Sequence, residues 1–86
     1  MFGLAIVDSG NYALQLCSIL EGKGYSFEVI PTPCKIAKGG CGYCLKFPLR
    51  FKDIVLQQAR RNGIIIREIY SIETQGLKNK YEKIYP

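Results

Sequence analysis

Six segments with contrasting hydrophobic periods determine what this chain can fold into. Four largely apolar segments at 2–7, 26–30, 43–47 and 64–70 have the lengths of strands, and the first is also rich in β-branched residues. Two segments of helical spacing, 9–24 and 51–62, separate them. Ser9 stands at the N-cap position of the first helical segment, and Gly24 and Gly63 stand where the two helices should end. The sequence therefore predicts the element order β-α-β-β-α-β.

This order favours an α+β fold of the ferredoxin-like type. Short connections and right-handed crossovers give a four-stranded antiparallel sheet of order 4-1-3-2, with two helices on one face. The 86 residues suffice for one domain, which we expect over residues 1–73. Residues 74–86 are polar and basic without a clear period, so a partly ordered C-terminal tail is expected there. The topology places the end of strand 2–7, the helix start at Ser9 and the connection between strands two and three at the same sheet edge.

The composition excludes several classes of chemistry. The chain has four cysteines, no histidine and a net charge of +5. Without an imidazole, the chain cannot form the catalytic site of a Cys-His or Ser-His-Asp hydrolase. It also cannot form a zinc site that contains histidine. A hydrophobic content of 48% supports a core without disulfide bridges, so the cysteines are expected to be free thiols. No apolar run approaches the ~18 residues of a membrane span, and no signal-peptide core is present, so a cytoplasmic protein is expected.

Three of the four cysteines lie close together between the second and third expected strands. Cys34, Cys41 and Cys44 form the pattern C-x6-C-x2-C among lysines and glycines. Cys41 is the best candidate for a reactive thiol because the glycines on both sides leave its sulfur open. Cys34 and Cys44 are candidate resolving thiols, although the exposure of Cys44 depends on which sheet face is bare. Cys17 falls on the apolar stripe of the first helix and is expected to be a buried packing residue.

A reactive thiol at this place requires a lowered pKa, since a free cysteine has a pKa near ~8.5. The N-terminus of the first helix stabilises an anion by roughly 0.3–1 kcal/mol, which is less than one pKa unit. Lysines and glycine N–H groups of the loop would have to supply the remainder, and Asp8 would oppose them if it points inward. The residues expected to bind the substrate are Ser9, Gly10, Asn11, Lys35, Lys38, Gly40 and Gly42.

The segment Pro31-Thr-Pro33 followed by Cys41-Gly42 is similar to the P-T-P … C-G signature of the selenium/sulfur carrier protein-like family. The similarity extends to Ser9, Ala13-Leu14 and Asn62-Gly63-Ile64, and covers about residues 3 to 73. The resemblance implies a carrier that holds sulfur or selenium on the cysteine at Cys41, as a persulfide or selenopersulfide. Its partners would be a donor enzyme such as a cysteine desulfurase and an acceptor enzyme, and it would not turn over a substrate alone.

The chain departs from the family pattern at two places. Cys34 stands where the family usually has arginine, and Ala37-Lys38-Gly39-Gly40 replaces serines before the C-G pair. A thiol at Cys34 would allow a persulfide on Cys41 to collapse into a Cys34–Cys41 disulfide and release the chalcogen. These departures suggest a redox-coupled member of the family, or a loop that binds metal.

The carrier interpretation requires no cofactor. Three other functions are alternatives to it. Zinc or an iron–sulfur cluster could bind Cys34, Cys41 and Cys44, although a second C-x2-C pair is missing. A thioredoxin-like use of Cys41 and Cys44 is disfavoured because that motif should open a helix, and here it opens a strand. RNA-recognition domains share the topology, but Gly42-Tyr43 alone matches their strand-three motif, so a nucleic-acid partner is not expected. A homodimer is left open.

Overall fold

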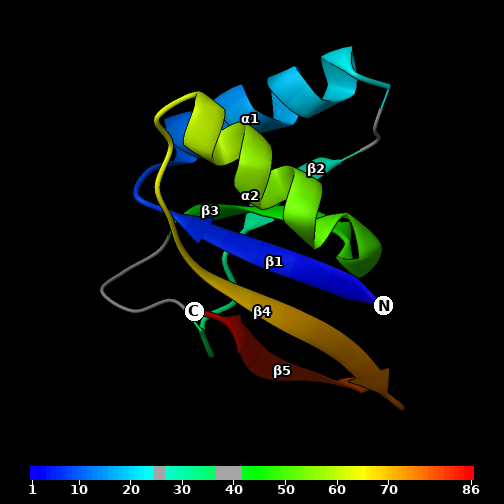
Figure 1. Ribbon diagram of the computed structural model, residues 1–86. Helices are drawn as coiled ribbons and strands as arrows, with labels where there is room; N and C mark the ends of the chain where they lie inside the picture. Colours follow the sequence, from blue (N-terminus) through cyan, green and yellow to red (C-terminus); the bar gives the residue numbers. More distant parts are fainter. Residues whose placement is uncertain (25–26, 37–41) are drawn as a thin grey trace.

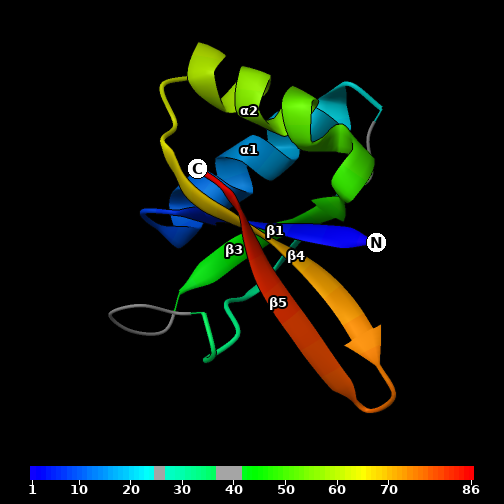
Figure 2. The same cartoon turned by 60° about the horizontal axis from the view of Figure 1, so that its bottom comes forward.

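The computed structural model describes residues 1–24, 27–36 and 42–86. Five strands form one antiparallel sheet of order β2-β3-β1-β4-β5. Two α-helices cover the same face of this sheet (Figures 1 and 2), so the predicted α+β class is confirmed. The elements are β1 (Phe2–Val7), α1 (Gly10–Gly22), β2 (Glu28–Pro31), β3 (Tyr43–Pro48), the 3₁₀ turn η1 (Leu49–Phe51), α2 (Lys52–Arg61), β4 (Ile66–Gln75) and β5 (Lys78–Tyr85).

The prediction of four strands is wrong, because the chain forms a fifth. The expected order 4-1-3-2 is present among β4, β1, β3 and β2, and β5 is added outside β4. The expected tail boundary falls inside β4, which continues to Gln75, and Lys78 pairs with Gln75 across a two-residue turn. Gly76 opens this turn with φ of 63°, a conformation that favours glycine in a tight hairpin. Residues 74–86 therefore extend the sheet (Figure 1).

The helix boundaries follow the predicted capping residues. Ser9 is the N-cap of α1, and its Oγ accepts a hydrogen bond from the Tyr12 amide at 3.4 Å. Gly24 and Gly63 follow the two helices with φ of 92° and 69°, as expected for residues that end a helix in a left-handed turn. Neither helix of the described ranges is long and apolar enough to cross a membrane.

The main core lies between the sheet and the two helices. Alternate residues of β3 contribute to it, since Leu45 and Phe47 are fully buried on this face while Cys44 faces the other side. Phe27 packs against Phe47 with ring centroids 6.0 Å apart. Cys17 belongs to this core, as predicted.

A smaller cluster lies on the face of the sheet that the helices leave bare. It consists of Leu4, Ile36, Cys44 and Tyr70, with partly buried Tyr81 of β5 packed against it. Ile36 comes from the connection after β2, which lies on the opposite side of the sheet from the helices (Figure 2). This connection carries Cys34, so part of the cysteine loop covers the helix-free face.

Candidate functional site

The shared sheet edge predicted from the topology is present. Ile6 at the end of β1 pairs with Cys44 near the start of β3, and Pro31 at the end of β2 pairs with Tyr43. Beyond Pro31, the Thr32 amide donates a hydrogen bond to the Gly42 carbonyl at 2.7 Å. This hydrogen bond therefore joins the two ends of the cysteine loop, one residue pair beyond the β2–β3 ladder.

Three of the predicted site residues lie outside the described residues, namely Lys38, Gly40 and Cys41. Gly42, which follows Cys41, is exposed at the base of the loop. A Cβ added to Gly42 would have only the Thr32 Oγ1, at 3.9 Å, within contact range among described atoms. Steric crowding in the described part of the chain therefore does not require glycine at this position.

A pocket of about 430 Å³ opens at the start of α1. Ser9, Gly10 and Asn11 line it together with Tyr43, and Leu14 and Val29 complete its wall. Gly10 allows the Tyr43 ring to approach the helix, since an added Cβ would lie 3.3 Å from Tyr43 Cδ2. The first turn of α1 carries no acidic residue. The partial positive charge of the helix start is therefore not offset within its own turn.

Asp8, which would oppose a thiolate at this edge if it pointed inward, is engaged by Arg67. Arg67 Nε donates a hydrogen bond to Asp8 Oδ1, and this contact raises the pKa of the arginine above its usual value. Arg67 lies at the start of β4, next to Ile66, which pairs with Val7. The arginine compensates the Asp8 charge and was missed in the sequence analysis, although the predicted strand at 64–70 already placed it at this edge.

Cys34 and Lys35 lie in an exposed turn, and Ile36 anchors this turn to the sheet. The Ile36 amide donates to the Pro33 carbonyl at 3.0 Å, and the Ile36 side chain is only 5% exposed. Lys35 lines a pocket with residues of β4 and β5 on the helix-free face. The structure therefore does not bring Lys35 into the pocket of Ser9, Gly10 and Asn11.

The other two described cysteines are buried. Cys44 has no exposed surface, and burial raises the pKa of its thiol, although a hydrogen bond with the Thr32 side chain acts in the opposite direction. The Cys17 Sγ donates to Glu21 Oε1 and to the Phe27 carbonyl, each at 3.5 Å, and burial followed by Glu21 raises the pKa of this thiol as well. Among the described cysteines, all of them free, Cys34 is the exposed one.

No group of three or more potential metal ligands occurs within residues 1–24, 27–36 and 42–86. The three-thiolate alternative therefore depends on Cys41, which lies outside these ranges, and on Cys44. A metal bound by Cys44 would require this fully buried side chain to leave its cluster and lose a proton.

The family described as "Putative Se/S carrier protein-like" matches residues 2–71. The chain belongs to this family. The matched part of this Se/S carrier-like protein runs from β1 into β4 and includes the helix start at Ser9 and the whole cysteine loop. Residues 72–75 of β4 and all of β5 lie beyond it. No curated protein and no solved structure matches the chain.

Proposed function

We propose that this protein carries sulfur or selenium on Cys41, as a persulfide or selenopersulfide, from a donor enzyme to an acceptor enzyme. The observation that carries the proposal is the family match over residues 2–71, which includes the complete C-x6-C-x2-C loop and the start of α1. A cysteine desulfurase is the donor class that suits a cysteine acceptor. The protein acts as an accessory carrier in the cytoplasm and does not catalyse a reaction alone.

The transfer is an exchange at sulfur. The Cys41 thiolate attacks the outer sulfur of the donor's persulfide, the donor's S–S bond breaks, and the donor cysteine leaves as a thiolate. The new Cys41 persulfide then passes its outer sulfur to a nucleophile of the acceptor, and Cys41 leaves as a thiolate. Each step forms one bond and breaks one bond without an external oxidant or reductant.

The sheet edge offers electrostatic support for a thiolate. The helix start has no acidic residue in its first turn, and Arg67 compensates Asp8. A helix N-terminus supplies about 0.3–1 kcal/mol to an anion, so lysine and amide groups of the loop provide the remainder in this proposal. Tyr43 follows Cys41 by two residues and walls the pocket at the helix start, which supports a cargo site at this edge.

Cys34 is the better candidate for the resolving thiol. It is exposed, whereas Cys44 is fully buried with a raised pKa, and a buried neutral thiol is a poor nucleophile. In this branch the Cys34 thiolate attacks the Cys41 sulfur, expels hydrosulfide and leaves a Cys34–Cys41 disulfide. A dithiol reductant must then restore both thiols before the next cycle.

Intact-mass spectrometry after incubation with a cysteine desulfurase and cysteine tests the proposal. Wild-type protein should gain one sulfur atom, and a Cys41→Ala variant should gain none. A Cys34→Ser variant should retain the adduct longer than wild type because the resolving thiol is missing. Cys44→Ala is the matched control, since it also removes one cysteine and should lose its adduct at the wild-type rate.

Two results would contradict the carrier. An undiminished adduct on Cys41→Ala would exclude Cys41 as the acceptor thiol. Zinc or iron that is bound in native spectra and removed by a chelator would favour the metal alternative on Cys34, Cys41 and Cys44. Equal adduct lifetimes in Cys34→Ser and wild type would leave the acceptor role standing but exclude Cys34 as the resolving thiol.

A further inference from the structure

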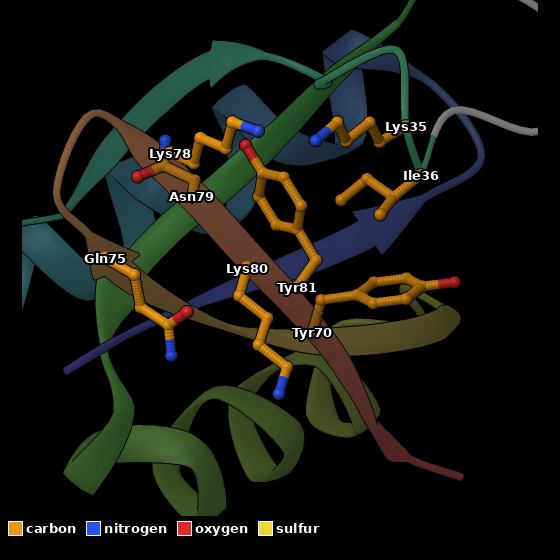
Figure 3. A pocket seen from close by; sticks show the side chains of 8 residues that line it. All are labelled: Lys35, Ile36, Tyr70, Gln75, Lys78, Asn79, Lys80 and Tyr81. Carbon is orange, nitrogen blue, oxygen red and sulfur yellow. The ribbon is translucent and has the colours of Figure 1, made fainter.

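A second pocket, of about 460 Å³, lies on the helix-free face where the β4–β5 hairpin meets the turn after β2 (Figure 3). Ile36 of the turn and Tyr70 of β4 provide apolar wall, and both belong to the smaller buried cluster. Most of the remaining wall comes from residues 75–81, beyond the part of the chain that the family model matches. The pocket is therefore a feature of this chain that the family match does not describe.

The charge of the pocket is positive. Among the described residues, its lining includes Lys35, Lys78 and Lys80 and no acidic residue. Figure 3 shows the ends of Lys35 and Lys78 directed toward the Tyr81 hydroxyl, while Lys80 extends the other way. Lys80 also stands opposite Glu73, a residue of opposite charge, in the β4–β5 register. Lys35, Lys78 and the Tyr81 hydroxyl thus form one group of donors that suits a phosphate.

Other groups in the pocket suit the base of a nucleotide. Tyr81 presents a half-buried ring in the same pocket, and aromatic rings are surfaces on which nucleobases stack. Gln75 and Asn79 bring amide groups to the lining. Thr74 Oγ1 donates to the side-chain Oδ1 of Asn79 at 2.9 Å, which leaves the side-chain Nδ2 of Asn79 as the donor for a ligand.

We propose that this pocket binds a nucleoside phosphate, with Lys35 and Lys78 on the phosphate and Tyr81 against the base. Its volume lies within the range of roughly 300–1,000 Å³ that small-molecule sites occupy. The expected third strand lacks the RNA-recognition motif, but β4 and β5 supply Tyr70 and Tyr81 on the helix-free face. The inference does not depend on the carrier chemistry of Cys41.

The nucleoside phosphate could be a free nucleotide or a residue of single-stranded RNA, and the experiment separates these sources. The full chain, kept reduced, is titrated with AMP and UMP by calorimetry and with a labelled single-stranded RNA decamer by fluorescence anisotropy. Lys78→Gln and Lys35→Gln should each weaken binding by about tenfold, and each should lower the salt dependence of RNA binding by about one unit of slope. Lys23→Gln is the matched control, because it removes the same charge at the end of α1, in the helix layer.

Each outcome of these titrations either supports or overturns the proposal. Binding of AMP or UMP that Lys78→Gln weakens supports the site with a free nucleotide as its source. Binding of the decamer alone, weakened by the same substitution, supports the site with RNA as its source. If Lys23→Gln loses as much binding affinity as Lys78→Gln, the loss reflects the net charge of the protein and not this pocket, which would overturn the proposal. No binding of any probe below about 1 mM would overturn it as well.

Discussion

Ile36 should hold the first half of the cysteine loop against the sheet, and its truncation to alanine tests this arrangement. The side chain is 5% exposed and packs in a cluster with Leu4, Cys44 and Tyr70 on the helix-free face. Cys44 is 0% exposed in the same cluster. Removing most of the Ile36 side chain should therefore destabilise the loop and open a path to the Cys44 thiol.

The expected magnitude follows from the size of the cluster. Truncation of a buried isoleucine to alanine costs about 2–5 kcal/mol, with the smaller values at sites that collapse readily. Ile36 packs with only three other buried members of this cluster among the described residues, so the lower end, about 2 kcal/mol, is expected. In a domain of this size that loss lowers Tm by roughly 8–16 °C. If the whole loss of about 2 kcal/mol favours local opening of the loop, alkylation of Cys44 accelerates by about thirtyfold.

Urea denaturation and mass-resolved iodoacetamide labelling of Cys44 measure the two effects on the same samples. Ile65→Ala is the matched control, because it makes the same chemical change at a side chain that is 68% exposed and should cost less than about 0.5 kcal/mol. Cys44 labelling within twofold of the Ile65→Ala rate, together with an unchanged denaturation midpoint, would show that Ile36 does not anchor the loop.

Two further predictions concern the stability of the sheet. Gly3→Ala should destabilise the protein by about 1–3 kcal/mol, because the new Cβ would lie 2.8 Å from Phe47 Cζ. Thermal unfolding measures this against Gly22→Ala, where a new Cβ would have no described atom within 4 Å apart from its chain neighbours and the backbone of its own helix. Burial raises the pKa of the Cys44 thiol above the value of a free cysteine. Its contribution to stability is therefore fully present below the free-cysteine pKa and is lost as the pH rises above it, because the unfolded chain then releases the thiol proton more readily. Urea midpoints at about pH 8 and pH 10 should therefore fall less in Cys44→Ala than in wild type, and equal declines would contradict the assignment.

Strands β1 to β4 and the two α-helices could be predicted because their segments show clear hydrophobic patterns. Phe2–Val7 is almost uniformly apolar, and the stripe of α1 repeats with the helical period. Ser9 and Gly63 mark helix boundaries through local backbone chemistry, which needs no tertiary information. The neighbour relations of β1 to β4 then follow from short connections and crossover handedness.

β5 was missed because its residues show no readable alternation. It is an edge strand with mostly exposed side chains, and a bulge in its pairing with β4 between Ile69 and Tyr70 breaks the two-residue period. As a result Tyr81 packs on the helix-free face while Tyr85 packs on the main core. The available signal was Gly76, at a position suited to a two-residue hairpin turn.

The details of the site depend on contacts between distant segments. Asp8 and Arg67 are 59 residues apart in the chain, and no local pattern relates them. The burial of Cys44 likewise depends on which face of the sheet the helices cover and on Ile36 lying over the other face. Residue types and spacing could locate the cysteine loop, but they could not decide which of its thiols are accessible.

The two outer strands also affect whether the protein resists aggregation. An exposed sheet edge offers unpaired N–H and C=O groups to another chain, and natural proteins block such pairing with short strands, proline and lysine. β2 is four residues long and ends at Pro31, and β5 carries Lys78, Lys80 and Lys83. A fragment limited to the family-matched residues 2–71 would uncover the flank of β4 and expose it to edge-to-edge aggregation. The C-terminal hairpin strand thus protects the sheet that supports the cysteine loop.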